Sequence, residues 1–130
     1  MKKVYLLLFT VFALVSCDPP HDIIFKNNTD FKAKVILKIK DKAKSYDLGE
    51  LVTGDSIVFN LIPETDDHIE FGIGTWSDKE IQLITSDLKS LTIKTHDKTV
   101  IYDNESQLKK LLTENRSSFP NTKINIEIEE

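Results

Sequence analysis

The clearest feature of the chain is a run of ten residues in which hydrophobic and polar side chains alternate. Across residues 31–40 every odd-numbered position is hydrophobic, and four of the five even-numbered positions are lysine. Because successive side chains of a strand point to opposite faces, this alternation predicts a half-buried antiparallel strand. The inward set is Phe31, Ala33, Val35, Leu37 and Ile39, and the outward lysines are Lys32, Lys34, Lys38 and Lys40.

The same period of two recurs in three later stretches, which predict three more strands. Residues 23–25 begin the core, and turn-forming clusters at 27–30, 41–44 and 53–55 fall between the strands. Fifteen isoleucines and ten threonines but only two alanines follow Cys17, a composition that favours sheet over helix. The later alternating sets are Ile57, Phe59 and Leu61; Ile69, Phe71 and Ile73; and Ile124, Ile126 and Ile128.

Two stretches carry helical signals instead. Ser77 and Glu80 have the spacing of a capping box. Among the residues that follow, one set of hydrophobic positions has the spacing of a helix and another has the alternation of a strand, so both interpretations stay open. The helical set is Ile81, Ile84 and Leu88, and the alternating set is Ile81, Leu83 and Thr85.

A second helix is predicted after Asn104, which has Gln107 three residues later. Its hydrophobic stripe is Leu108, Leu111 and Leu112, with Lys109 and Lys110 opposite. Pro120 and Asn121 then lead into the last strand. The expected fold is mainly β, of the α+β class: an antiparallel sheet or β-sandwich, immunoglobulin-like or transthyretin-like, with one or two short helices.

The first 17 residues differ from the rest of the chain. Lys2 and Lys3 precede a hydrophobic run at residues 4–15 in which Thr10 is the only polar side chain. As a helix this run would rise about 18 Å, well short of the roughly 30 Å hydrocarbon core of a bilayer. It therefore predicts a signal segment rather than a stable membrane span. An ordinary secretory signal, or a cytosolic protein with an apolar N-terminus, is the alternative interpretation.

The run ends in Leu14-Val15-Ser16-Cys17, which resembles the lipobox of bacterial lipoproteins. The resemblance implies a diacylglycerol on the Cys17 sulfur, cleavage between Ser16 and Cys17, and an N-acyl chain on the new first residue. The chain would then consist of a signal peptide at 1–16, a lipidated Cys and short spacer at 17–22, and one β-rich soluble domain at 23–130. No other cofactor is expected.

The resemblance also implies a location in the bacterial cell envelope, on the inner or the outer membrane. Asp18, directly after the Cys, resembles the inner-membrane retention signal of enteric bacteria. The composition rich in Ile, Lys and Asn is similar to that of small lipoproteins of the Bacteroidetes, in which the outer membrane or cell surface would be the destination.

Charge and cysteine content exclude several function classes. The chain has a net charge of −4, and loss of the first 16 residues would leave 114 residues with 15 basic and 21 acidic side chains, a net charge of −6. A nucleic-acid binder that acts through an overall positive field is therefore not expected. A single Cys excludes an internal disulfide and any multi-Cys metal centre within one chain.

Catalytic and metal-binding motifs are not recognisable. His21, His68 and His96 each lie beside an Asp, but they are far apart in predicted loops, and the favoured interpretation is exposed turn residues. Ser86 and Lys89 have the S-x-x-K spacing of penicillin-interacting enzymes without the other elements those enzymes need. We expect no enzyme and no metal site.

Two features are candidates for partner binding. Lys32, Lys34, Lys38 and Lys40 would form a basic stripe on one face of an acidic protein, suited to an anionic partner. The alternative is a solvated strand face whose lysines prevent edge-to-edge aggregation. Trp76 follows two glycines, so it fits either an exposed stacking residue or a residue that completes a small core.

Three functional hypotheses follow. The first is a non-enzymatic, lipid-anchored binding module that contacts an envelope protein or glycan. The second is an accessory structural subunit of an envelope assembly, in which a partner completes an exposed strand edge. The third is a small hydrolase, or an inhibitor of one.

Overall fold

The computed structural model describes residues 19–41 and 48–130, so the lipobox and most of the predicted turn at 41–44 lie outside the described residues. The elements in chain order are β1 (Pro20–Asn27), β2 (Ala33–Ile39), the 3-10 helix η1 (Gly49–Leu51), β3 (Ser56–Leu61), β4 (Asp66–Ile73), α2 (Asp78–Asp87), β5 (Leu88–Lys94), β6 (Thr99–Tyr102), α3 (Glu105–Glu114) and β7 (Lys123–Ile128).

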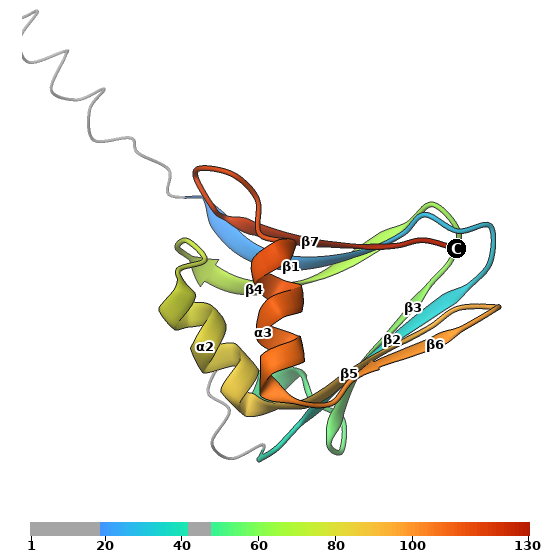
Figure 1. Cartoon of the computed structure of the whole chain (residues 1–130), viewed down its shortest axis with the longest axis horizontal. Coiled ribbons are helices and arrows are strands. Elements are labelled where there is room, and N and C mark those ends of the chain that lie inside the picture. The colour runs from blue at the N-terminus through green and yellow to red at the C-terminus, as the bar shows by residue number, and fades with distance from the viewer. Residues whose placement is uncertain (1–18, 42–47) are drawn as a thin grey trace, which may run out of the picture.

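The strands form two sheets, which confirms the prediction of a mainly β, sandwich-like α+β fold. One sheet has the strand order β4-β1-β7 and the other β3-β2-β5-β6. The sheets converge where β1 passes to β2 and β3 passes to β4, and both helices lie between the sheets at the opposite end (Figure 1). One hydrophobic core fills the space between these layers. The parallel pairing of β1 with β7 was not predicted from the sequence.

The alternating pattern places side chains as expected in most positions. The inward side chains of β2 and β7 are buried, and the lysines of β2 are exposed. Two inward assignments were wrong. Phe31 is 45% exposed because it precedes the first residue of β2, and its ring stacks on His96 instead. Ile73 is 70% exposed because it follows Gly72, whose positive φ of 79° turns the end of β4 outward.

Both predicted helices are present. Ser77 caps α2 through the complete capping box with Glu80. Ile81 and Ile84 are buried whereas Leu83 is 56% exposed, which decides for the helix over the alternating strand. Asn104 caps α3 by accepting a hydrogen bond from the Gln107 amide. The expected stripe of α3 faces the core, with Leu108 and Leu112 buried and Leu111 half-buried.

Asn27 lies at the convergent end of the two sheets, in the predicted turn cluster. Its fully buried side-chain amide donates to the carbonyls of Phe31 (2.8 Å) and Leu61 (3.2 Å). Its carbonyl oxygen accepts from both the amide and the hydroxyl of Thr29. Its backbone also bonds to Glu64 and Thr65. The Asn27 side chain thus links the connection from β1 to β2 with the connection from β3 to β4, the two places where the chain passes between the sheets.

Candidate functional site

The predicted basic stripe lies on the outer face of the four-stranded sheet, which we call the lysine face. Strand register arranges it in rows across the strands. Lys34 lies between Asn60 and Lys94, and Lys38 lies between Ser56 and Ser90. Between these two rows, Ile36 lies between Val58 and Thr92, and Ile101 of β6 is paired with Thr92. An apolar band therefore runs between two rows that contain lysine.

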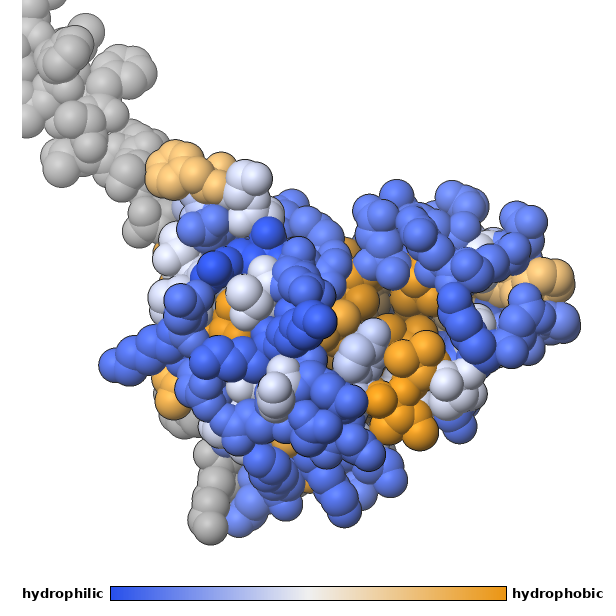
Figure 2. Space-filling view, in the orientation of Figure 1, coloured by the Kyte–Doolittle hydropathy of each residue, from blue (hydrophilic) through white to orange (hydrophobic). Residues whose placement is uncertain are grey.

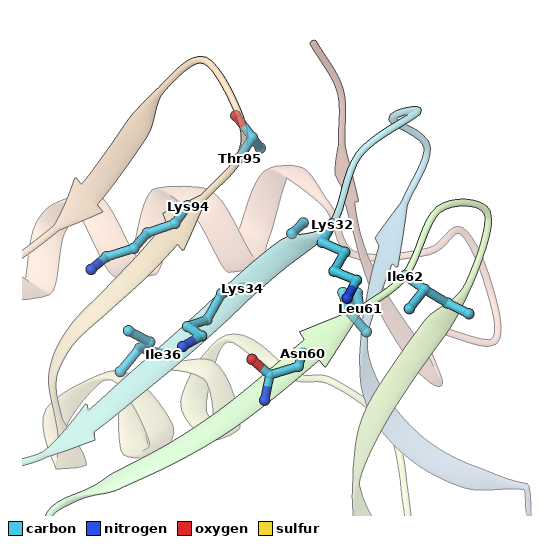
Figure 3. A pocket seen from close by; sticks show the side chains of 9 residues that line it. Lys32, Lys34, Ile36, Asn60, Leu61, Ile62, Lys94 and Thr95 are labelled. Atoms are coloured by element: carbon cyan, nitrogen blue, oxygen red, sulfur yellow. The ribbon is translucent and has the colours of Figure 1, made fainter.

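One end of the lysine face is hollowed. A hollow of about 460 Å³ is lined by residues before and along β2, at the end of β3 and at the end of β5. Figure 3 shows Lys32 and Lys34 projecting on the same side of the sheet as Asn60, with Lys94 extending from β5 beside them. The full lining is Lys32, Ala33, Lys34, Ile36, Asn60, Leu61, Ile62, Lys94 and Thr95.

The sequence identified four lysines of this face but missed Lys94, Asn60 and Ile62. Lys94 belongs to β5, Asn60 belongs to β3 and Ile62 directly follows β3, and the period of two does not say which strands are neighbours. Only the register places Lys94 directly opposite Lys34. Lys40, the last lysine of the stripe, is exposed just beyond the end of β2, outside the hollow.

The lysine face carries positive charges that are not balanced by acidic side chains on the same strands. Among the described residues, no carboxylate forms an ion pair with Lys34 or Lys94, and the outward positions of the four strands hold no acidic side chain. Asp55 lies just before β3. The hydrogen bond from the Ser56 hydroxyl, together with the positive charges of Lys38 and Lys89, lowers the pKa of the Asp55 carboxyl below its ordinary value. The outer face of the four strands is therefore basic, and Asp55 is a carboxylate at its margin.

Trp76 does not belong to the lysine face. Its side chain is 1% exposed, and its indole nitrogen donates to the Asp22 carbonyl at 3.1 Å. The ring packs against His21 and Phe71, with centroids 4.7 and 5.1 Å away. Trp76 therefore completes the core in the present structure, the second of the two interpretations that the sequence left open.

His21 corrects another expectation, because it is a buried residue of β1 rather than an exposed turn residue. Its Nδ1 lies 3.1 Å from the Gly72 carbonyl oxygen, and its ring contacts Trp76. A Cβ added at Gly74 would come within 3.3 Å of the imidazole, so the glycine makes room for the ring. The aromatic contacts that bury His21 come from residues about fifty positions later, which no local pattern reveals.

The other two histidines are exposed, His68 on β4 and His96 in the turn between β5 and β6. Within residues 19–41 and 48–130, no group of three or more His, Cys, Asp or Glu side chains is arranged to hold a metal ion. Over the same residues, no helix is both long and apolar enough to cross a membrane.

Comparison with protein-family models and with curated proteins gave no match. The structure therefore defines a class of fold. The chain is a small sandwich-like α+β protein with a basic, partly apolar outer face on its larger sheet.

Proposed function

We propose that this chain is a non-enzymatic binding module, anchored by a lipid on Cys17 to a bacterial envelope membrane, whose lysine face binds an anionic protein or glycan. The observation that carries the proposal is the placement of Lys34 directly opposite Lys94 on neighbouring strands. Like charges in directly opposed positions destabilise a sheet. An anionic partner would relieve this repulsion, so the free protein tolerates a cost that binding removes.

The apolar band narrows the chemistry of the partner. Val58 and Ile101 are exposed large hydrophobic residues on the lysine face, in the same row across the strands as the half-buried Ile36. A fully hydrated polyanion gains nothing from such contacts, whereas a partner that presents anionic groups around an apolar patch buries both. A folded protein surface or a glycan with carboxylates and apolar ring faces has this chemistry.

The position of the hollow favours a partner other than the anchoring membrane. Pro20 starts β1 at the end of the molecule that carries α2, whereas β2 begins and β5 ends at the opposite end (Figure 1). Cys17 precedes Pro20 by three residues, a tether of about 10 Å at full extension. A lipid at Cys17 would thus hold the β1 start near the bilayer, with the hollow directed away from it.

Photo-crosslinking in the native envelope tests the lysine face. A photoreactive residue at Thr92, in the middle of the face, should form a discrete adduct whose protein or sugar component mass spectrometry identifies. The triple change Lys34→Gln, Lys38→Gln and Lys94→Gln should reduce the adduct about tenfold, since each exposed ion pair is worth about 0.5 kcal/mol.

The matched control removes three exposed lysines elsewhere, through Lys79→Gln, Lys109→Gln and Lys123→Gln. It changes the net charge by the same amount and should leave the adduct intact. Equal yields from both triple variants would contradict a binding role for this face.

The anchor has its own test. Metabolic labelling with a fatty acid should label the full chain, and Cys17→Ala should remove the label and release the protein from the membrane fraction. Two or three acyl chains hold a small domain firmly on a bilayer, because each buried CH₂ contributes about 0.8 kcal/mol. Label that survives in Cys17→Ala would contradict lipidation, and Ser45→Ala serves as the control substitution outside the lipobox.

A further inference from the structure

A second binding surface lies where the edge strands of the two sheets face each other. β6 ends one sheet and β7 ends the other. Figure 2 shows hydrophobic residues in a hollow between these two strands. A hollow of about 260 Å³ lies between β6 and β7, and an adjoining hollow of about 380 Å³ lies between β6 and α3; the two share Val100 and Tyr102. We call them together the edge groove.

The lining of the edge groove comes from the protein core. Ile93 and Ile128 are core residues, and Tyr102 and Leu111 are half-buried residues packed against the core. Val100 is also half-buried. The half-buried Val100, Tyr102 and Leu111 are therefore the apolar side chains that a group entering the groove can contact.

β6 offers backbone groups along the same seam. The Thr95 amide bonds to the Lys98 carbonyl in the turn, and Ile93 pairs with Val100. Antiparallel strands alternate between paired and outward-facing residues, so the N–H and C=O groups of Thr99 and Ile101 point away from β5. The four residues of β6 include no charge, Pro or Gly, the devices that normally protect an edge strand.

Both edges of the three-stranded sheet are better protected. Along β7 the segment after α3 covers part of the edge, through hydrogen bonds from Ser117 to the Lys123 carbonyl and from Asn125 to the Asn115 carbonyl. β4 carries two Asp, one Glu and a Gly with positive φ. β3, the opposite edge of the same sheet, also has no charge, Pro or Gly, so the adjoining hollows rather than composition alone distinguish β6 as the edge open to pairing.

The charges of the groove define the occupant further. Glu127, Glu129 and Glu130 line its β7 side, and Lys98 lines its β6 side. Lys110, at the α3 end, is 3.8 Å from Glu114 and so is already paired. The groove is acidic on balance, so a basic segment complements it. A second copy related by a two-fold axis would bring its own three glutamates against these.

We propose that the edge groove binds a basic, extended segment of a different protein. The segment adds to β6 as a further strand, places alternate apolar side chains on the floor of the groove and directs Lys or Arg toward Glu127, Glu129 and Glu130. Strand addition of this kind takes its affinity from main-chain hydrogen bonds and its specificity from alternate side chains. The edge groove shares only Ile101 and Thr95 with the lysine face, and the glutamates that define its occupant lie outside that face.

Binding of two synthetic peptides to the full chain in detergent micelles tests the proposal. In the first, lysine and valine alternate over about seven residues, the length of an ordinary strand. The second has the same composition with the valines grouped together. The alternating peptide should bind at least threefold more tightly, roughly the effect of one net hydrogen bond. Its binding should also slow hydrogen exchange of the Thr99 and Ile101 amides.

Two variants locate the site. Glu127→Gln with Glu129→Gln should weaken the alternating peptide at least about threefold, whereas Asp66→Asn with Glu70→Gln, the same charge change on β4, should not. Ile101→Pro removes an outward amide from an edge strand, where proline is tolerated, and should abolish the exchange protection. Equal binding of both peptides, equal effects of both double variants, or no binding at millimolar peptide would overturn the proposal.

Discussion

Replacement of Trp76 with alanine is expected to lower the free energy of unfolding by about 3–5 kcal/mol, the usual cost of removing a large aromatic side chain from a core. Trp76 is the largest fully buried side chain of the described protein. The change removes its ring contacts with His21 and Phe71 and leaves the Asp22 carbonyl without the indole donor. All these groups lie at the wide end of the sandwich, where α2 meets β1 and β4.

Urea denaturation followed by circular dichroism measures this effect, since Trp76 is the only tryptophan and fluorescence would be lost with it. Trp76→Phe keeps an aromatic ring and loses the hydrogen bond, so it should cost less than Trp76→Ala. Ile73→Ala serves as the control, because Ile73 is close in sequence and exposed. A cost below about 1 kcal/mol for Trp76→Ala would show that Trp76 is not a core residue.

The second large effect is expected at Asn27, where alanine should cost about 2–4 kcal/mol. Its amide group is fully buried, and its removal takes a donor from the Leu61 carbonyl and an acceptor from the Thr29 amide, whereas the Phe31 carbonyl keeps the Thr29 hydroxyl as a donor. A buried polar group that loses its partner costs about 1–3 kcal/mol. Thr29 lies in the connection from β1 to β2 and Leu61 at the start of the connection from β3 to β4, so the loss weakens both connections between the sheets.

Asn28→Ala provides the matched control, because Asn28 is the next residue, is half-buried, and makes its hydrogen bond to Ile128 through the backbone. The same denaturation experiment should show little change for Asn28→Ala. Asn27→Asp keeps an oxygen that accepts from Thr29 but sets a second carboxylate oxygen against the Phe31 and Leu61 carbonyls, so it should cost at least as much as Asn27→Ala. Equal costs at the two positions would contradict the linking role of Asn27.

Local patterns predicted most of the secondary structure because their signals are complete within a few residues. The alternation along β2 and β7 specifies a buried and an exposed face without reference to any partner strand. The capping box of Ser77 and Glu80 likewise contains both of its own hydrogen-bond partners. Ile73 failed the pattern because the positive φ of Gly72 interrupts the strand geometry on which the alternation depends.

The sites depend on pairings between distant segments, and these were not predictable from one sequence. Lys34 and Lys94 are sixty positions apart, and only the β2–β5 register makes them neighbours. Predicting the edge groove would require knowing that β6 and β7 are edge strands of different sheets and lie next to each other. The burial of His21 was not predictable for the same reason, because Phe71 and Trp76, which pack on it, lie about fifty residues further along the chain.

The parallel pairing of β1 with β7 also governs the order of folding. β1 is the central strand of its sheet, and its two neighbours begin at Asp66 and Lys123. The sheet around β1, the first described strand, can therefore be completed only when β7, the last strand, is available. Such pairing between distant segments raises the contact order and is expected to slow folding. If the chain is exported N-terminus first through a translocation channel, as the proposed lipid anchor requires, the three-stranded sheet could be completed only after β7 has emerged.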